Sequence, residues 1–266
     1  MTASTEIAYP RLTRRYVELK DRPSEARLQA AQTTTAAQLR TEFLESVQAF
    51  SQFNAEGLTD GGEFFPASRT DDGKNLKSDT RTFGWAMTLK AMKSVPVAGS
   101  NDLAFRYVER EIIPTRTKPQ LPFAGGEGKH VRVDLVLANV ATGRPIVGEL
   151  KIASDKDPFT GLVQALAGAA QLVPAHQRKR LMTLARPLAS IADEPLVDVY
   201  VLLGNFPTRG RDRFKQLDCA VELAAQLEAD DALARHLGRI RILALRRDDR
   251  GAISASTRLP TPPAAR

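Results

Sequence analysis

Two acidic residues and a lysine interrupt apolar stretches in the middle of this 266-residue chain. Asp134 lies in Val-Arg-Val-Asp-Leu-Val-Leu, and Glu149 and Lys151 lie in Ile-Val-Gly-Glu-Leu-Lys-Ile. Because side chains alternate along a strand, Glu149 and Lys151 point to the same face. Burying such charges is costly unless they are paired or bound to a metal. Two carboxylates with the Leu150 carbonyl offer the oxygen ligands that Mg²⁺ prefers, which indicates metal-assisted phosphodiester hydrolysis.

Lys151 has a defined part in that chemistry. Its ammonium would orient the attacking water, or help to deprotonate it, and would offset charge developing in the transition state. The competing interpretation is a structural salt bridge between Glu149 and Lys151 on an exposed strand face. The apolar residues on both sides favour a buried site instead.

Two strands must bring these residues together. The patterns predict strands over 131–137 and 146–152, joined by a turn at 142–145, so Asp134 and Glu149 lie on neighbouring strands within reach of one divalent cation. A helix rich in small residues follows over 158–173. A strand at 196–203, a helix over 212–237 and a strand at 239–245 complete the region.

The rest of the chain predicts a helical extension and a mixed sheet. We expect a short strand at 15–19, one or two helices over 24–55, a loop over 56–80, and helices over 82–95 and 101–113. The expected fold is α/β, with a central mixed β-sheet flanked by helices. Its divisions are an N-terminal extension (1–96), a core (97–248) and a disordered tail (249–266).

Asp134, fourteen intervening residues and then Glu149-Leu150-Lys151 resemble the motif of the PD-(D/E)XK nuclease superfamily, over about residues 100–205. The resemblance implies a restriction-endonuclease-like core with Mg²⁺ or Mn²⁺ as cofactor. It also implies an acidic metal ligand on the helix before the hairpin, Glu109 in preference to Glu111. Gln164, on the following helix, is implied to hold the site.

Basic residues near these elements are candidate contacts to nucleic acid. The net charge of +7 and pI near 9.7 suit a polyanion partner, although such a charge is also ordinary for solubility. A polar hairpin tip and solvated helix ends remain the alternative interpretations. The candidates are Lys129, His130, Arg132, Arg178, Lys179, Arg209 and Arg211.

Composition excludes several classes. The lone cysteine, Cys219, allows neither an intramolecular disulfide nor a cysteine-based zinc site. No apolar run is long enough to span a bilayer, and the first residues lack the order of a secretory signal, so we expect no membrane association. We expect a cytoplasmic protein, and its richness in Ala, Arg and Leu suggests a GC-rich bacterium.

The sequence therefore predicts a Mg²⁺- or Mn²⁺-dependent nuclease, an endo- or exonuclease acting on DNA rather than RNA. The alternative is a catalytically inactive module of the nuclease fold, which binds nucleic acid or a protein in a larger defence or phage-related assembly. A second copy of the chain, or a protein partner, would bind through the N-terminal helices.

Overall fold

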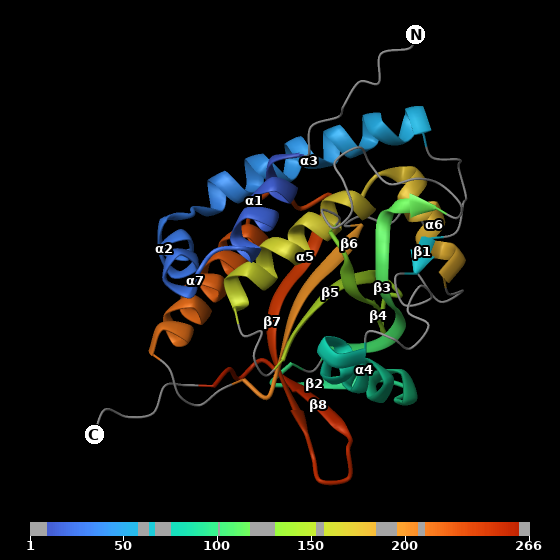
Figure 1. Cartoon of the computed structure of the whole chain (residues 1–266). Helices are drawn as coiled ribbons and strands as arrows, with labels where there is room; N and C mark the ends of the chain where they lie inside the picture. Colours follow the sequence, from blue (N-terminus) through green and yellow to red (C-terminus); the bar gives the residue numbers. More distant parts are fainter. Residues whose placement is uncertain are drawn as a thin grey trace.

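Seven strands pair side by side until the last meets the first. The computed structural model describes residues 10–57, 64–66, 76–100, 102–117, 131–152, 157–184, 196–206 and 211–260. The strands are β2 (Val95–Ala98), β3 (Ala104–Thr117), β4 (Val133–Asn139), β5 (Pro145–Ile152), β6 (Val197–Gly204), β7 (Leu237–Arg247) and β8 (Ile253–Ser256). They follow the order β3-β2-β8-β7-β6-β5-β4, and β4 pairs again with β3. The result is a closed mixed barrel (Figure 1).

The long strand β3 closes this barrel. Its N-terminal end pairs with β2, and residues 105–112 pair antiparallel with β4. A short strand, β1 (Phe64–Pro66), pairs with its C-terminal part outside the ring. Strands β5, β6 and β7 run parallel to one another, as do β2 and β8.

The predicted open sheet flanked by helices, the restriction-endonuclease-like core, is therefore wrong. Two errors account for it. Residues 101–113, predicted as a helix, include most of the closing strand β3, whose register shifts between Tyr107 and Glu109 and so breaks the alternation of a regular strand. The tail, predicted as disordered, contains β8, which bridges β7 and β2.

The barrel separates two apolar cores. The inner core includes Leu135, Leu150, Tyr200 and Leu243, together with Trp85 of α4 (Leu76–Ala91). The outer core lies between the barrel wall and helices that cover it. Those helices are α1 (Arg11–Lys20), α2 (Ser24–Thr33), α3 (Ala36–Gly57), α5 (Pro158–Leu172) and α7 (Arg211–Glu228). A further helix, α6 (Ala175–Leu184), follows α5 in the chain and contacts both α5 and β3.

The first three helices share a core with the barrel. In Figure 1, α5 lies on the barrel wall and α1 and α3 lie across α5. Leu12, Leu39 and Phe43 are fully buried in the same core as Phe159 and Leu166 of α5. The N-terminal helices therefore form an outer layer over α5, and the expected strand at 15–19 is part of helix α1.

The elements around the motif agree with the prediction. Strands β4, β5, β6 and β7 and helices α5 and α7 lie where expected, with α7 ending at Glu228 instead of 237. The loop predicted over 56–80 contains β1 and the start of α4, and most of its other residues lie outside the described part of the chain. None of the helices described is long and apolar enough to cross a membrane.

Candidate active site

The β4–β5 hairpin brings the two predicted carboxylates onto neighbouring strands. Leu135 pairs with Gly148 and Val136 with Val147, so the same register places Asp134 beside Glu149. Val136 and Val147 belong to the outer core. Because side chains alternate, Asp134 and Glu149 also face outward, toward the layer that contains α5.

Three polar groups make direct contact at this point. The Oδ2 atom of Asp134 accepts a hydrogen bond from the backbone N–H of Leu150 at 3.1 Å. The Nζ atom of Lys151 lies 2.8 Å from Oε1 of Glu149. Glu149 and Lys151 are only 2% and 5% exposed, whereas Asp134 is half-buried. The prediction that these residues form a buried cluster is confirmed, and the exposed salt bridge is excluded.

Gln164 connects this cluster to the next helix. Its Oε1 accepts from Lys151 Nζ at 3.4 Å, and its Nε2 donates to the carbonyl of Arg132 at 3.2 Å. The side chain thus spans from Lys151 on β5 to the residue before β4. Gln164 therefore contacts the lysine from helix α5, the helix from which the resemblance implies that it holds the site.

An N-cap fixes the start of helix α5, and a glycine allows the helix to pack closely on strand β5. Asp157 caps the helix by accepting from the N–H and the hydroxyl of Thr160 at 2.9 and 2.7 Å. A Cβ on Gly161 would lie 3.0 Å from Cε of Lys151. The missing side chain therefore gives Lys151 its space under the helix.

Burial and charge act together on Glu149. Burial raises the pKa of its carboxyl well above the usual range, the neighbouring Asp134 raises it further, and Lys151 lowers it. Two adjacent carboxyl groups tend to retain one proton between them. A divalent cation at this position would replace that proton and remove the repulsion.

The donor set fits a hard cation. Two carboxylates are available, from Asp134 and Glu149, and the Leu150 carbonyl points toward β4 because its N–H bonds to Asp134. Oxygen ligands of this kind suit Mg²⁺ or Mn²⁺. Within the described residues, no group of three or more His, Cys, Asp or Glu side chains gathers at one point. Such a cation would therefore complete its coordination with water or substrate.

Glu109 differs from its expected place. It lies on strand β3 and not on a helix, and it pairs with Val136 in the register. Its carboxylate accepts from the Tyr107 hydroxyl at 3.3 Å and from the Arg110 N–H at 3.0 Å. These contacts do not join it to Asp134 or Glu149, so the geometry does not support Glu109 as a metal ligand.

Glu111 occupies the position beside Asp134. Arg110 pairs with Leu135 and Ile112 with Val133, which leaves Glu111 between them, next to Asp134 in the register. Its φ of 50° is the left-handed conformation that non-glycine residues rarely adopt. Its carboxylate lies 3.3 Å from the Arg110 guanidinium. Because the sequence predicts a helix for this segment, it does not predict the β3–β4 pairing that places Glu111 beside Asp134.

The basic candidates are only partly placed. Arg132 is exposed two residues before Asp134. Arg178 and Lys179 lie on α6, which Gln177 and Arg180 hold to the Pro114 carbonyl of β3 at 2.9 and 2.8 Å. Arg211 begins α7, while Lys129, His130 and Arg209 lie outside the described residues. Contact of these residues with nucleic acid therefore stays a prediction.

Comparisons of the chain with models of protein families, with curated proteins and with solved structures find no match. The function is therefore inferred from the geometry of Asp134, Glu149, Lys151 and Gln164.

Proposed function

We propose that this protein is a Mg²⁺- or Mn²⁺-dependent nuclease that hydrolyses phosphodiester bonds, with DNA as the favoured substrate. The observation that carries the proposal is the convergence of Asp134, Glu149 and Lys151 in one buried cluster. Charged groups are rarely left in a core without a reason, and here two acids and one base meet at neighbouring strands.

Each residue has a distinct role in this proposal. Asp134 and Glu149, with the Leu150 carbonyl, would hold the metal. A bound divalent metal supplies Lewis-acid polarisation of the phosphoryl oxygen and lowers the pKa of the attacking water. Lys151 holds its ammonium beside Glu149, where it orients the water and offsets negative charge in the transition state. Gln164 positions Lys151.

Substrate would approach from the side of Asp134. Glu149, Lys151 and Gln164 are nearly inaccessible, whereas Asp134 is half-buried and the nearby Arg132 is exposed. Arg132 is therefore the described cation best placed to contact a phosphate next to the site. The lone cysteine and the composition support a cytoplasmic bacterial enzyme.

One observation favours the alternative, a non-catalytic module. The Glu149–Lys151 pair is short and buried, so each charge already has a partner in the protein alone. A structural ion pair would need no metal. Metal binding and turnover separate the two functions, because the inactive module has neither.

The decisive experiment is cleavage of labelled plasmid, linear duplex, single-stranded DNA and RNA with Mn²⁺, Mg²⁺ or EDTA. The parent protein is compared with Glu149→Ala and Lys151→Ala, and with Lys215→Ala, which removes an exposed lysine on α7. We expect metal-dependent cutting by the parent and by Lys215→Ala, and loss of cutting in the two site variants. Circular dichroism verifies that each variant is folded.

Two results would overturn the proposal. If Glu149→Ala and Lys151→Ala cut as well as the parent, the catalytic assignment is wrong. If the folded parent neither binds Mn²⁺ nor cuts any substrate, the carboxylates are structural and the binding module is the better function.

A further inference from the structure

A pocket lies among the three N-terminal helices, on the opposite side of α5 from the candidate active site. Its volume is about 290 Å³, and α1, α2, α3 and the α1–α2 connection form its walls. Four arginines line it together with two acids: Arg11, Arg14, Arg15, Arg22, Glu18 and Glu42. The four guanidinium groups exceed the two lining carboxylates by two positive charges, and by one when Glu45, which lies beside Arg11, is included.

Helix α1 supplies this charge on one face. Arg11, Arg15 and Glu18 follow one another at intervals of three or four residues, which is the spacing of one helix face, and Arg22 lies in the connection just after the helix. Leu12, Tyr16 and Leu19 are buried in the outer core, and α1 packs on α5. The core contact therefore holds the arginine face in a fixed orientation toward α3.

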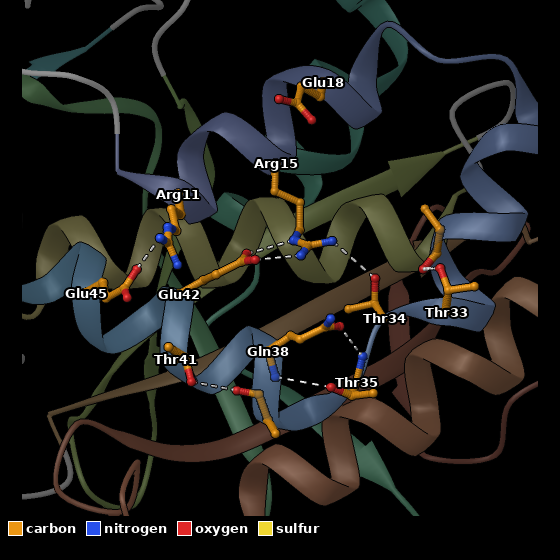
Figure 2. Close-up of polar contacts among 12 residues, drawn as sticks. Arg11, Arg15, Glu18, Thr33, Thr34, Thr35, Gln38, Thr41, Glu42 and Glu45 are labelled. Carbon is orange, nitrogen blue, oxygen red and sulfur yellow. Dashed lines mark hydrogen bonds and ion pairs between the residues drawn. The ribbon is translucent and has the colours of Figure 1, made fainter.

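Arg15 is the rigid part of the pocket. Its Nη2 and Nε atoms contact the two carboxylate oxygens of Glu42 at 2.5 and 2.7 Å, and its Nη1 donates to the Thr34 hydroxyl at 3.3 Å. Figure 2 shows this guanidinium between α1 and α3, with α5 passing behind. Since these bonds use most of its donors, Arg15 shapes the pocket and neutralises Glu42.

Two of the remaining arginines, Arg11 and Arg22, form only exposed ion pairs with the acids near them. Arg11 lies 3.5 Å from Glu45, with the two side chains 68% and 45% exposed (Figure 2). Arg22 lies 3.6 Å from Glu18, and both side chains are about half exposed. Exposed ion pairs of this kind contribute at most about 1 kcal/mol. A dianionic ligand can therefore replace the carboxylate partners of these arginines at little cost. Arg14 is exposed on the same wall.

We propose that this pocket binds the phosphate group of a small phosphorylated metabolite. Planar guanidinium groups match phosphate oxygens in paired hydrogen bonds, which makes arginine the usual residue for phosphate recognition. The volume is at the lower end of ligand sites, suited to a phosphate with a sugar-sized group. Among the described residues that line the pocket, Leu19 and Ala30 are apolar and none is an aromatic residue that could stack on a base. The proposal does not depend on nuclease activity.

The test measures ligand binding to the full chain, at constant ionic strength in EDTA. The two readouts are the shift in melting temperature and calorimetry. The ligands are inorganic phosphate, ribose 5-phosphate, ribose, and a single-stranded oligonucleotide without terminal phosphates. The variants are Arg14→Gln and Arg22→Gln, with Lys20→Gln as the matched control. Lys20 is an exposed cation of α1 that does not line the pocket.

We expect ribose 5-phosphate and phosphate to raise the melting temperature progressively with concentration and to give saturable binding by calorimetry, and ribose to do neither. Either arginine variant should weaken binding about tenfold or more, the usual cost of one charge-assisted contact, while Lys20→Gln binds like the parent. The proposal fails if no phosphate compound binds saturably, or if Lys20→Gln weakens binding as much as the arginine variants. It also fails if the oligonucleotide displaces ribose 5-phosphate at lower concentration, since the ligand is then a nucleic-acid backbone.

Discussion

Lys151 and Glu149 form a buried ion pair two residues apart on one strand, with Nζ 2.8 Å from Oε1. Here Gln164 lies on the other side of the ammonium and Asp134 lies beside Glu149, so four polar groups lie together between the barrel wall and helix α5. The pair therefore has unequal members. Glu149 has a second acid beside it and can take up a proton, whereas the ammonium depends on the carboxylates around it.

This asymmetry predicts unequal stability effects. Glu149→Gln removes the nearest counter-charge of a buried ammonium, and we expect the free energy of unfolding to fall by about 3 kcal/mol. Lys151→Met should cost less, about 1 kcal/mol, because Glu149 becomes neutral by retaining a proton. Urea unfolding in EDTA at pH 7 measures both values. A larger loss for Lys151→Met would show that Glu149 stays ionised in the folded protein.

Gln164 predicts a partial loss of activity. Gln164→Ala removes the acceptor that holds Lys151 from the helix side, while both carboxylates remain. If the protein is a nuclease, we expect kcat to fall about tenfold with KM little changed, because a misplaced ammonium weakens only transition-state interactions. Gln226→Ala, which removes an exposed glutamine of α7, is the control and should cut like the parent. Equal activity of the two variants would remove Gln164 from the site.

The site was predictable because it is local. Asp134 and Glu149 are separated by one hairpin, and alternation along β4 and β5 fixes which side chains share a face. The small residues of α5 likewise indicated a helix lying close to strands, and Gly161 and Gly168 both contact them. Short-range periodicity thus suffices for the cluster of Asp134, Glu149 and Lys151.

The barrel was not predictable for the opposite reason. Closure depends on the pairing of Val95 with Phe105 and of Val97 with Ala255, and strands β2 and β8, of four residues each, are too short for a long alternating pattern. The irregular register in β3 also makes its apolar spacing similar to that of a helix. Glu109 was misplaced as a direct consequence, since its expected position rested on that helix.

Two glycines of α5 predict separable effects. A Cβ at Gly168 would lie 2.8 Å from Cγ2 of Val133, and one at Gly161 would lie 3.0 Å from Cε of Lys151. We expect Gly168→Ala to lower the free energy of unfolding by about 1–3 kcal/mol through overpacking. Gly161→Ala should displace Lys151. We therefore expect it to reduce the rate of metal-dependent cleavage, while it lowers the free energy of unfolding less than Gly168→Ala does.

Gly84 provides the matched control for these variants. It lies within α4, and nothing stands within 4 Å of a Cβ built on it. Gly84→Ala should therefore raise stability by about 0.5–1 kcal/mol through helix propensity. Chemical denaturation of the three variants compares them directly, and stabilisation by Gly168→Ala would contradict the close packing of α5 on β4.

Asp198 predicts how stability depends on pH. This fully buried carboxyl lies on β6, and its Oδ1 accepts from Arg144 at 3.1 Å and from the Arg239 N–H at 2.9 Å. Within the described residues its Oδ2 has no hydrogen-bond partner. Burial raises the pKa of Asp198, outweighing the hydrogen bond from Arg239 and the charge of Arg144, which lower it.

Because the folded protein holds this proton more tightly than the unfolded chain, the stabilisation from Asp198 is complete below the unfolded pKa, near 3.8. It is lost as the pH rises through the folded pKa, by about 1.4 kcal/mol for each pH unit between the two pKa values. Asp198→Asn lacks this titration. The free energy of unfolding of the parent, minus that of Asp198→Asn, should therefore fall as the pH rises from 3.8 and then level off.

Arg144→Gln sharpens this test, because it removes a charge that lowers the pKa of Asp198. In the Arg144→Gln background, the difference in free energy of unfolding between the protein that retains Asp198 and its Asp198→Asn variant should continue to fall up to a higher pH. Urea unfolding at intervals of half a pH unit, on the parent, both single variants and the double variant, gives the two curves. A difference that rises with pH would mean that the folded protein favours the ionised carboxylate, so that Arg144 and Arg239 outweigh the burial of Asp198.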